Sequence, residues 1–500
     1  MSIMGIDIGT TGTKAVIFDE QGAILASHYI EYPLHTPEPD QCEINPEDVW
    51  SAVMETISVT AHSAGEKDPV EAIGVSTLGD SLTLLDRAGN TLSNTVVGAA
   101  DRRAVSQAAH LEEYMDRTKL FEQTGQPLHA FCVIPKILWF RDNKPDIYEK
   151  AAKFTGWQEI MHLRLGLSPS MDYSLASKTM LMDICRKDWA EDLFRSCGFS
   201  SRQFYPLAPS DEVVGTLSGK NATPLGLHAG VAVVAGGFDQ CCCALGAGVL
   251  TAGKAANTIG TLEAITAISA APRLQRALLE NNYGCGFHVI PGSYFSLGFV
   301  TTSGGVLRWY RDTLAAHETI RARQKQIDPY EVIINTTDES PSSVFVLPYF
   351  AGAGTPWLDE HQRGSIFGLT LGTEKREIIK GILDGICYEV RLNLETLAAS
   401  GITMESLQAV GGGTRSHRWM QLKADITGIP VEVTGVSEAG CLGAAFLAGL
   451  GVGKYSSSSD IDSIVKVIRV FEPRSLLSVR YEESYQKYLE LRNRLRGLVI

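Results

Sequence analysis

The chain has 500 residues, which is more than a single hydrophobic core accommodates, because such cores stop growing near roughly 250–300 residues. Two large domains are therefore expected. A formal net charge of −13 without a basic run argues against nucleic acid or an anionic membrane as partner. Ten cysteines without a CxxC pair indicate neither a disulfide framework nor a zinc site. The sequence has no segment of signal-peptide type and no apolar run of ~20 residues, which predicts a cytoplasmic protein.

The first part of the chain alternates apolar runs with turns. Residues 3–8, 15–18 and 23–30 are predicted to form a three-stranded antiparallel meander. Further strands are expected at 70–75 and 231–235, with a helix-rich stretch at 104–152 between them.

A similar strand, turn and strand at 255–269 indicates a duplicated architecture. Glycine is dense at 246–253, where the pattern restarts, so the predicted domains are 1–248 and 249–500.

The second part continues with predicted strands at 344–347 and 407–410 and predicted helices at 375–400 and 418–427. Residues 478–500 have the spacing of an amphipathic surface helix. Because no low-complexity linker separates the halves, we expect two domains that close on each other.

Three glycine-rich turns are candidate phosphate-binding elements. GIDIGTTGTK at 5–14 puts Asp7 at a strand end, where a carboxylate suits hydrated Mg²⁺, and its exposed N–H groups, hydroxyls and Lys14 suit phosphate. The others are the Gly260-Thr261 turn and GGGTRS at 411–416, which leads into a helix N-terminus. Plain hairpins would also explain the first two, and neither GxxxxGK[ST] nor a helix-opening GxGxxG is present.

Asp239 is the candidate catalytic carboxylate. It follows the predicted strand at 231–235 and two glycines, so it is expected at the edge of a cleft. Phosphoryl transfer requires a positioned hydroxyl and a carboxylate that accepts its proton. The alternative is an N-cap for a helix that begins at Gln240.

The sequence resembles the FGGY family of carbohydrate kinases, of the actin and hexokinase superfamily, from Ile6 to its end. The resemblance rests on six ordered segments: GIDIGTTGTKAVIFD at 5–19, VAGGFDQ at 234–240, NTIGT at 257–261, GSIFGLT at 364–370, GGGTRSHRWMQLKADITGIPV at 411–431 and EAGCLGAAFLAG at 438–449. It implies an α/β fold of two ribonuclease-H-like domains with a cleft between them, the first binding sugar and the second ATP.

The resemblance also assigns roles to particular residues. Asp239 would be the general base, and Asp7 and Asp239 would lie at the Mg²⁺ ion. The implied ATP-binding residues are Thr10, Thr11, Thr13, Lys14, Gly260, Thr261, Gly304, Arg308, Gly412, Gly413, Thr414 and His417. A surface salt bridge would also account for Arg308 or His417. The implied substrate-binding residues are Gly79, Asp80, Asp101, Arg103, Phe131 and Gln240.

The sugar site departs from the family patterns. Gly79-Asp80 replaces the Arg-Glu pair of glycerol kinases, which argues against glycerol, and the Gln-Met-His-Gly string of D-xylulokinases is absent. Alanines precede Asp101 where relatives often have a tryptophan. Asp101 and Arg103 could bind hydroxyls or a carboxylate, or could belong to an exposed helix start.

These features predict ATP-dependent phosphorylation of a small sugar, with a pentulose first. A gluconate, ketogulonate or polyol kinase is the alternative within the family, and the DRRA string at 101–104 resembles that of ketogulonate- and gluconate-type or L-xylulose-type kinases. The alternative of another class is a non-catalytic nucleotide or sugar sensor on the same fold. A homodimer is common among relatives of this kind.

Overall fold

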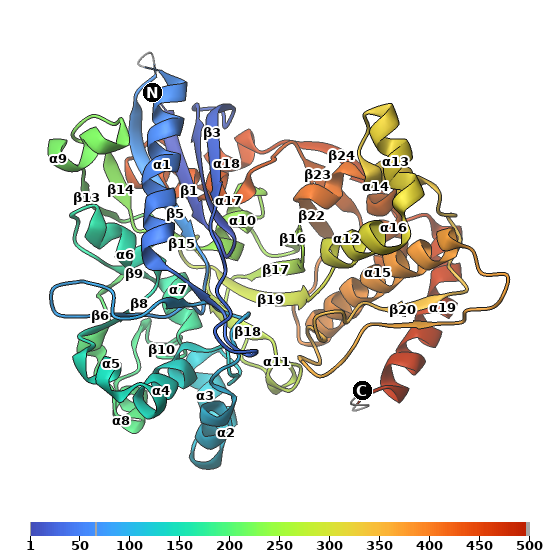
Figure 1. The fold of residues 1–500 in the computed structure, drawn as a ribbon, viewed down its shortest axis with the longest axis horizontal. Coiled ribbons are helices and arrows are strands. Elements are labelled where there is room, and N and C mark those ends of the chain that lie inside the picture. Colours follow the sequence, from blue (N-terminus) through green and yellow to red (C-terminus); the bar gives the residue numbers. More distant parts are fainter. Residues whose placement is uncertain (1, 66–67, 497–500) are drawn as a thin grey trace.

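The structure, a computed structural model, describes residues 2–65 and 68–496. It contains two seven-stranded sheets, each surrounded by helices, and the blue-to-green first half and the yellow-to-red second half lie next to each other (Figure 1). Within the described residues, no helix is both long enough and apolar enough to span a bilayer.

The first sheet begins with the predicted meander. In spatial order its strands are β13 (Val213–Thr216), β14 (Ala232–Val234), β5 (Val70–Thr77), β1 (Ser2–Ile8), β2 (Gly12–Phe18) and β3 (Ile24–Glu31), with β15 (Gly237–Phe238) beside the end of β5. The β3-β2-β1 part is antiparallel, whereas β5 runs parallel to β1 and β14 parallel to β5.

The second sheet repeats this arrangement. Its strands are β18 (Gly284–Phe287), β19 (Tyr294–Val300), β17 (Glu263–Ser269), β16 (Lys254–Ile259), β22 (Ser406–Val410), β23 (Val431–Thr434) and β24 (Val467–Phe471). An antiparallel β19-β17-β16 part is again followed by two parallel neighbours, β22 and β23. The predicted duplication is therefore confirmed.

The helices of the first half cover its sheet and build a helical layer below it in Figure 1. They are α1 (Pro46–Ala64), α2 (Val105–Tyr114), α3 (Arg117–Thr124), α4 (Val133–Asn143), α5 (Pro145–Lys150), α6 (Trp157–Arg164), α7 (Tyr173–Lys178), α8 (Glu191–Cys197) and α9 (Gly219–Ala222). The helix-rich stretch predicted at 104–152 is thus confirmed. Short strand pairs, β4 (Glu43–Ile44) with β7 (Thr95–Val96) and β6 (Thr83–Leu85) with β8 (Lys153–Thr155), connect these helices to the sheet.

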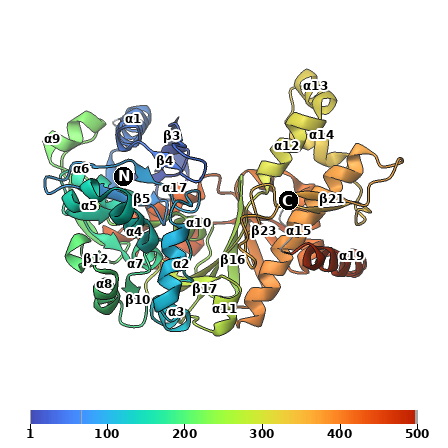
Figure 2. The same cartoon turned by 60° about the horizontal axis from the view of Figure 1, so that its bottom comes forward.

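The second half is built around a long helix. Its helices are α11 (Arg276–Glu280), α12 (Gly304–Leu314), α13 (Ala316–Lys325), α14 (Pro329–Asn335), α15 (Lys375–Ala399), α16 (His417–Thr427) and α19 (Ser475–Arg494). Figure 2 shows α12, α13 and α14 rising from this half. The strand predicted at 344–347 is observed as β20 (Phe345–Leu347), which pairs with β21 (Ser365–Phe367) outside the large sheet.

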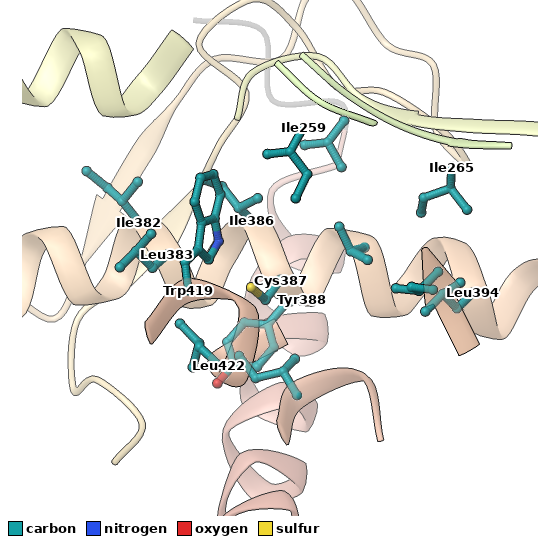
Figure 3. Packing of buried hydrophobic residues seen from close by; sticks show 14 of the residues in the cluster. Ile259, Ile265, Ile382, Leu383, Ile386, Cys387, Tyr388, Leu394, Trp419 and Leu422 are labelled. Atoms are coloured by element: carbon teal, nitrogen blue, oxygen red, sulfur yellow. The ribbon is translucent and has the colours of Figure 1, made fainter. Parts of the chain in front are cut away.

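The core of the second half lies between α15, α16 and the sheet. Figure 3 shows Trp419 of α16 against Ile382 and Ile386 of α15, and all three side chains are buried. The helix predicted at 478–500 is observed as α19, and residues 497–500 lie outside the described part of the chain. Its buried face carries Tyr481, Tyr485 and Tyr488, so the helix contributes to the core.

Two helices interlock the halves. Helix α17 (Ala439–Gly451) follows β23 in the sequence, yet it packs on β1 and β5 of the first sheet, where a Cβ on Gly74 would lie 1.8 Å from the Ala444 carbonyl oxygen. Helix α10 (Asp239–Gly246) follows the first sheet, and its Ala244 packs with Ala256 of the second. The two helices pack closely on each other, so each half contributes one helix to the junction between the two sheets.

Candidate active site

Asp239 is placed at the carboxyl end of a strand. Strand β15 pairs in parallel with β5, so the chain enters α10 at the sheet edge with Asp239 as the first helical residue. The N-cap position is Phe238 and has no side-chain cap, so the alternative of Asp239 as N-cap is wrong. Its Oδ1 atom is buried without a hydrogen-bond partner among the described residues. Burial and, to a smaller extent, the charge of Asp7 raise the pKa of Asp239 to about 7, against the hydrogen bonds from Gln240.

Asp7 faces the same region from the end of β1. Its Oδ1 accepts a hydrogen bond of 2.6 Å from the Ser76 hydroxyl on β5. Burial raises the pKa of Asp7, although Ser76 and Lys14 oppose the shift. Two neighbouring carboxylates, one of which has an unpartnered oxygen, form a donor set that suits a hard divalent cation.

The β1–β2 turn next to Asp7 is closed by a 3.0 Å hydrogen bond from the Gly9 N–H to the Gly12 carbonyl. Thr10 and Thr11 are accessible on this turn. Thr13 is fully buried on β2 opposite Ile8 and does not share their accessible face, so the structure does not bring its hydroxyl to the turn surface as expected.

Lys14 has a partner that sequence reasoning missed. Its Nζ lies 2.8 Å from Oε2 of Glu438, immediately before α17, and 5.4 Å from the centroid of the Tyr29 ring. This ion pair joins the phosphate-type turn of the first half to a segment of the second. The 424 residues between the partners explain why no local pattern predicted it.

A pocket of about 700 Å³ opens in the second half. Its walls are the β16–β17 turn, the N-termini of α12 and α16, and helix α14. Seven predicted residues line it: Gly260, Thr261, Gly304, Arg308, Gly412, Gly413 and His417. Thr414 does not line it, because its hydroxyl turns back to the Gly411 carbonyl, 2.8 Å away.

Close backbone approach forms this pocket. The Gly304 N–H donates to the Gly260 carbonyl at 2.9 Å, and a Cβ on Gly304 would lie 2.6 Å from that oxygen. Gly411 has a φ of 95°, which favours glycine, and a Cβ there would lie 2.5 Å from the Ile259 carbonyl oxygen. Residues with side chains at these positions would push the turns apart.

The pocket wall includes polar residues that were not predicted. Tyr330, Arg415 and Arg418 line it, and Arg418 donates to the Thr337 carbonyl. His417 accepts from the Arg469 guanidinium at 2.7 Å and lies beside the Phe471 ring. Tyr330 lies outside every motif used in the sequence analysis, whereas Arg418 lies within the 411–431 segment but was given no role there.

Asp80 occupies the predicted sugar-binding loop in a strained backbone conformation, with φ of 56°. Its Oδ2 lies 3.2 Å from Lys178 Nζ, and both side chains are about nine-tenths buried. Lys136 Nζ donates to the carbonyls of Asp80 and Gly98, at 2.7 and 2.9 Å. Burial lowers the pKa of Lys136 to about 8. Neither lysine was predicted.

Asp101 and Arg103 lie together in the interior of the first half. Asp101 is fully buried, so the alternative of an exposed helix start is wrong. Its Oδ2 accepts from the Cys42 N–H at 2.7 Å and from Arg103 Nε at 2.9 Å. Arg103 also pairs with Glu43 at 2.8 Å. Asp101 and Arg103 therefore bind each other, and their remaining contacts are to the Cys42 backbone and to Glu43.

The remaining predicted sugar-site residues gather near Asp239. Lys178 Nζ lies 6.0 Å from the centroid of Phe131 and 5.7 Å from that of Phe238. A Cβ on Gly79 would lie 2.7 Å from the Phe238 ring, so this loop position admits no side chain without rearrangement. The Gln240 Oε1 atom is buried and has no partner among the described residues.

Comparison with known proteins shows which family the sequence matches. The sequence profile of the FGGY family of carbohydrate kinases, N-terminal domain, matches residues 2–246, and that of its C-terminal domain matches residues 255–452. The gluconokinase of Bacillus subtilis is 32% identical over 470 residues, covering 93% of this chain and 90% of that protein. The xylulose kinase of the same species is 27% identical over 489 residues, covering 97% and 95%. A glycerol kinase of Caldanaerobacter subterraneus is 30% identical over 484 residues, covering 94% of each.

Solved structures agree with this result. A gluconate kinase from Lactobacillus acidophilus superimposes with a TM-score of 0.90 at 25% identity, covering 100% of this chain and 99% of that one. The ligand-bound xylulose kinase from the same species gives a TM-score of 0.89 at 25% identity with the same coverage. The expected two-domain actin and hexokinase-like fold is therefore confirmed.

Proposed function

The chain belongs to the FGGY family of carbohydrate kinases, and from this membership we propose that it transfers the γ-phosphoryl group of ATP to a hydroxyl of a small sugar, with a pentulose as the first candidate. The observation that carries the proposal is Asp239, whose buried Oδ1 has no partner in the described part of the chain and lies near Asp7 at the strand ends of the first sheet.

The proposed reaction needs one proton acceptor. The acceptor hydroxyl oxygen forms a bond to the γ-phosphorus, the bond from that phosphorus to the β,γ-bridging oxygen breaks, and ADP leaves. Asp239 takes the hydroxyl proton at Oδ1. A pKa of about 7 suits this exchange at neutral pH because the group can both accept and release a proton.

Mg²⁺ fits the residues at the proposed phosphate site. Asp7 and Asp239 would hold it, since each carboxylate keeps an unfavourable charge without a cation, as the raised pKa values indicate. A bound Mg²⁺ supplies positive charge that neutralises the phosphate oxygens.

The nucleotide has a matching pocket in the second half. A volume of about 700 Å³ accommodates an adenosine group, and Arg308, Arg415 and Arg418 on its wall complement an anion. The N-termini of α12 and α16 add partial positive charge there.

A gluconate-type acid is the second candidate acceptor, because the gluconokinase of B. subtilis shares 32% identity with this chain. Glycerol is disfavoured, since Gly79-Asp80 stands where glycerol kinases carry Arg-Glu and a side chain at Gly79 would collide with Phe238.

The test is acceptor-dependent release of ADP from MgATP, measured on pentuloses, hexuloses, aldonates, polyols and glycerol. We expect at least one sugar-type acceptor to raise ADP release well above the ATPase rate without acceptor, with glycerol a poor substrate. MgATP should also raise the melting temperature, because it binds the folded state only. No thermal shift and no acceptor dependence would refute the kinase and support a non-catalytic role.

A further inference from the structure

The acceptor site of the proposed kinase has a distinct charge preference. Resting on the proposed function, we propose that this site selects an uncharged polyhydroxy substrate over an aldonate. We infer that the buried Lys178–Asp80 ion pair, with its 3.2 Å separation, is the specificity-determining element.

Among the described residues, three of the buried unpartnered atoms in this region are acceptors, beside the Thr77 hydroxyl, which can also donate. Asp239 Oδ1, Asp80 Oδ1 and Gln240 Oε1 are buried without a hydrogen-bond partner among the described residues. All three accept hydrogen bonds, and Asp80 and Asp239 are near enough for their charges to interact. A buried acceptor without a donor is unfavourable, so this set is complementary to hydroxyl groups, which donate.

The ammonium group of Lys178, which lies in this region, is already paired with a carboxylate. Lys178 Nζ pairs with Asp80 Oδ2 and lies 3.4 Å from Gln126 Oε1, between the rings of Phe131 and Phe238. In so apolar a setting the ammonium keeps its charge because of Asp80, whose charge raises the pKa of Lys178 against the effect of burial. The pair therefore offers an incoming carboxylate no net positive charge.

Three further cations of this region are also occupied. Lys136 donates to two backbone carbonyls, and Arg103 pairs with Asp101 and Glu43. Arg102 lies 3.2 Å from Glu360 of the second half. An aldonate whose reacting hydroxyl faces Asp239 would bring its carboxylate into a region where these four side chains already have partners. A ketose or polyol would meet the same acceptors with hydroxyls alone.

The first test uses the wild-type protein. We compare kcat/KM by ADP release for uncharged acceptors (D-xylulose, D-ribulose, L-ribulose and xylitol) and for acids (D-gluconate and 5-keto-D-gluconate). We expect the best uncharged acceptor to exceed the best acid by at least about tenfold, within the range that one mispaired polar group produces. An acid with equal or higher kcat/KM overturns the inference and leaves the kinase intact.

The second test changes the ion pair. Asp80→Asn keeps the shape of the side chain and leaves the Lys178 ammonium without its counterion, so the ratio of kcat/KM for D-gluconate to that for the best uncharged acceptor should rise at least about tenfold. Asp183→Asn is the matched control, since Asp183 is a buried aspartate of the same half that pairs with Arg186, and its ratio should equal that of the wild type.

The results distinguish the role of the Lys178–Asp80 ion pair from the proposed kinase function. A ratio that is unchanged or lower in folded Asp80→Asn contradicts the role of the ion pair. If Asp80→Asn does not fold, the wild-type selectivity still decides the preference. ADP release that no acceptor stimulates, in either class, refutes the proposed function itself and the inference with it.

Discussion

At the scale of single residues, the environment of Asp239 disfavours its charged form, and the same environment suits the residue to the proposed role of proton acceptor. Burial and the neighbouring Asp7 charge raise its pKa from 3.8 to about 7. The folded protein therefore binds the Asp239 proton more tightly than the unfolded chain does. Stability from this proton is fully present below about pH 3.8 and is lost as pH rises toward and through the folded pKa of about 7. A site kept for catalysis commonly lowers stability in this way.

This linkage predicts the behaviour of Asp239→Asn in the absence of ligands. Asparagine stays uncharged, so the variant should melt close to the wild type near pH 4 and at a higher temperature at pH 8. The measurement is the melting temperature of both proteins between pH 4 and pH 8. A difference that does not change with pH would contradict a raised Asp239 pKa.

The site residues that sequence could predict are those in contiguous motifs. Asp7, Asp239 and the glycine turns stand in short strings whose spacing indicates their chemistry. Lys136 could not be found in this way, because the carbonyls it binds lie 56 and 38 residues away. Asp101 followed a local helix-start pattern, but the Cys42 N–H that it binds lies 59 residues earlier and holds it in the interior.

At the scale of elements, α4 joins two loops of the first half, the ones proposed to bind sugar, through Lys136. This side chain joins the loop at Asp80 to the segment at Gly98, and Asp80 is in a strained conformation. Two hydrogen bonds from a charged donor maintain that geometry, each worth about 1.5–3 kcal/mol.

Lys136→Met should therefore raise the acceptor KM by at least about tenfold and leave the ATP KM unchanged. Lys150→Met, on the exposed face of neighbouring α5, is the control and should alter neither constant. Steady-state kinetics with each substrate varied would check this. A lower melting temperature with an unchanged acceptor KM would show that Lys136 only supports the fold.

The close packing of α17 on the first sheet leads to a second prediction for this scale, which concerns the stability of the folded protein. Gly74→Ala would put a Cβ 1.8 Å from a backbone carbonyl of α17, so strand and helix must separate, at a cost of about 1–3 kcal/mol or more. Gly219→Ala in α9, where a Cβ meets only the Ala229 Cβ at 3.9 Å, should be neutral or slightly stabilising. Urea unfolding of the three proteins would measure both effects, and equal midpoints would refute the close packing.

Elements with strong local patterns were predictable, and their partners were less so. The hairpins at 3–18 and 255–269 and the long helix at 375–400 were confirmed because apolar periodicity defines them locally. The position of α17 on the first sheet was not predicted, since its nearly all-apolar sequence marks it as buried without indicating which sheet it covers.

At the scale of the whole molecule, the pocket proposed for the nucleotide and Asp239 belong to different halves. The ion pairs Lys14–Glu438 and Arg102–Glu360 already join these halves. Phosphoryl transfer requires the two sites to meet with water excluded, so closure is expected when both ligands bind. Small-angle scattering should show a smaller radius of gyration with acceptor and a nonhydrolysable ATP analogue together than with neither. An unchanged profile would indicate a rigid, preformed cleft.

The central claim is that the two halves bring ATP to an acceptor whose proton goes to Asp239. The most direct measurement is acceptor-dependent turnover of folded Asp239→Asn on the best acceptor, together with its affinity for ATP. We predict that turnover falls by at least about 10²-fold, as expected for loss of a general base, while ATP affinity changes little because the adenosine pocket lies in the other half. Near-normal turnover of this variant would contradict the account.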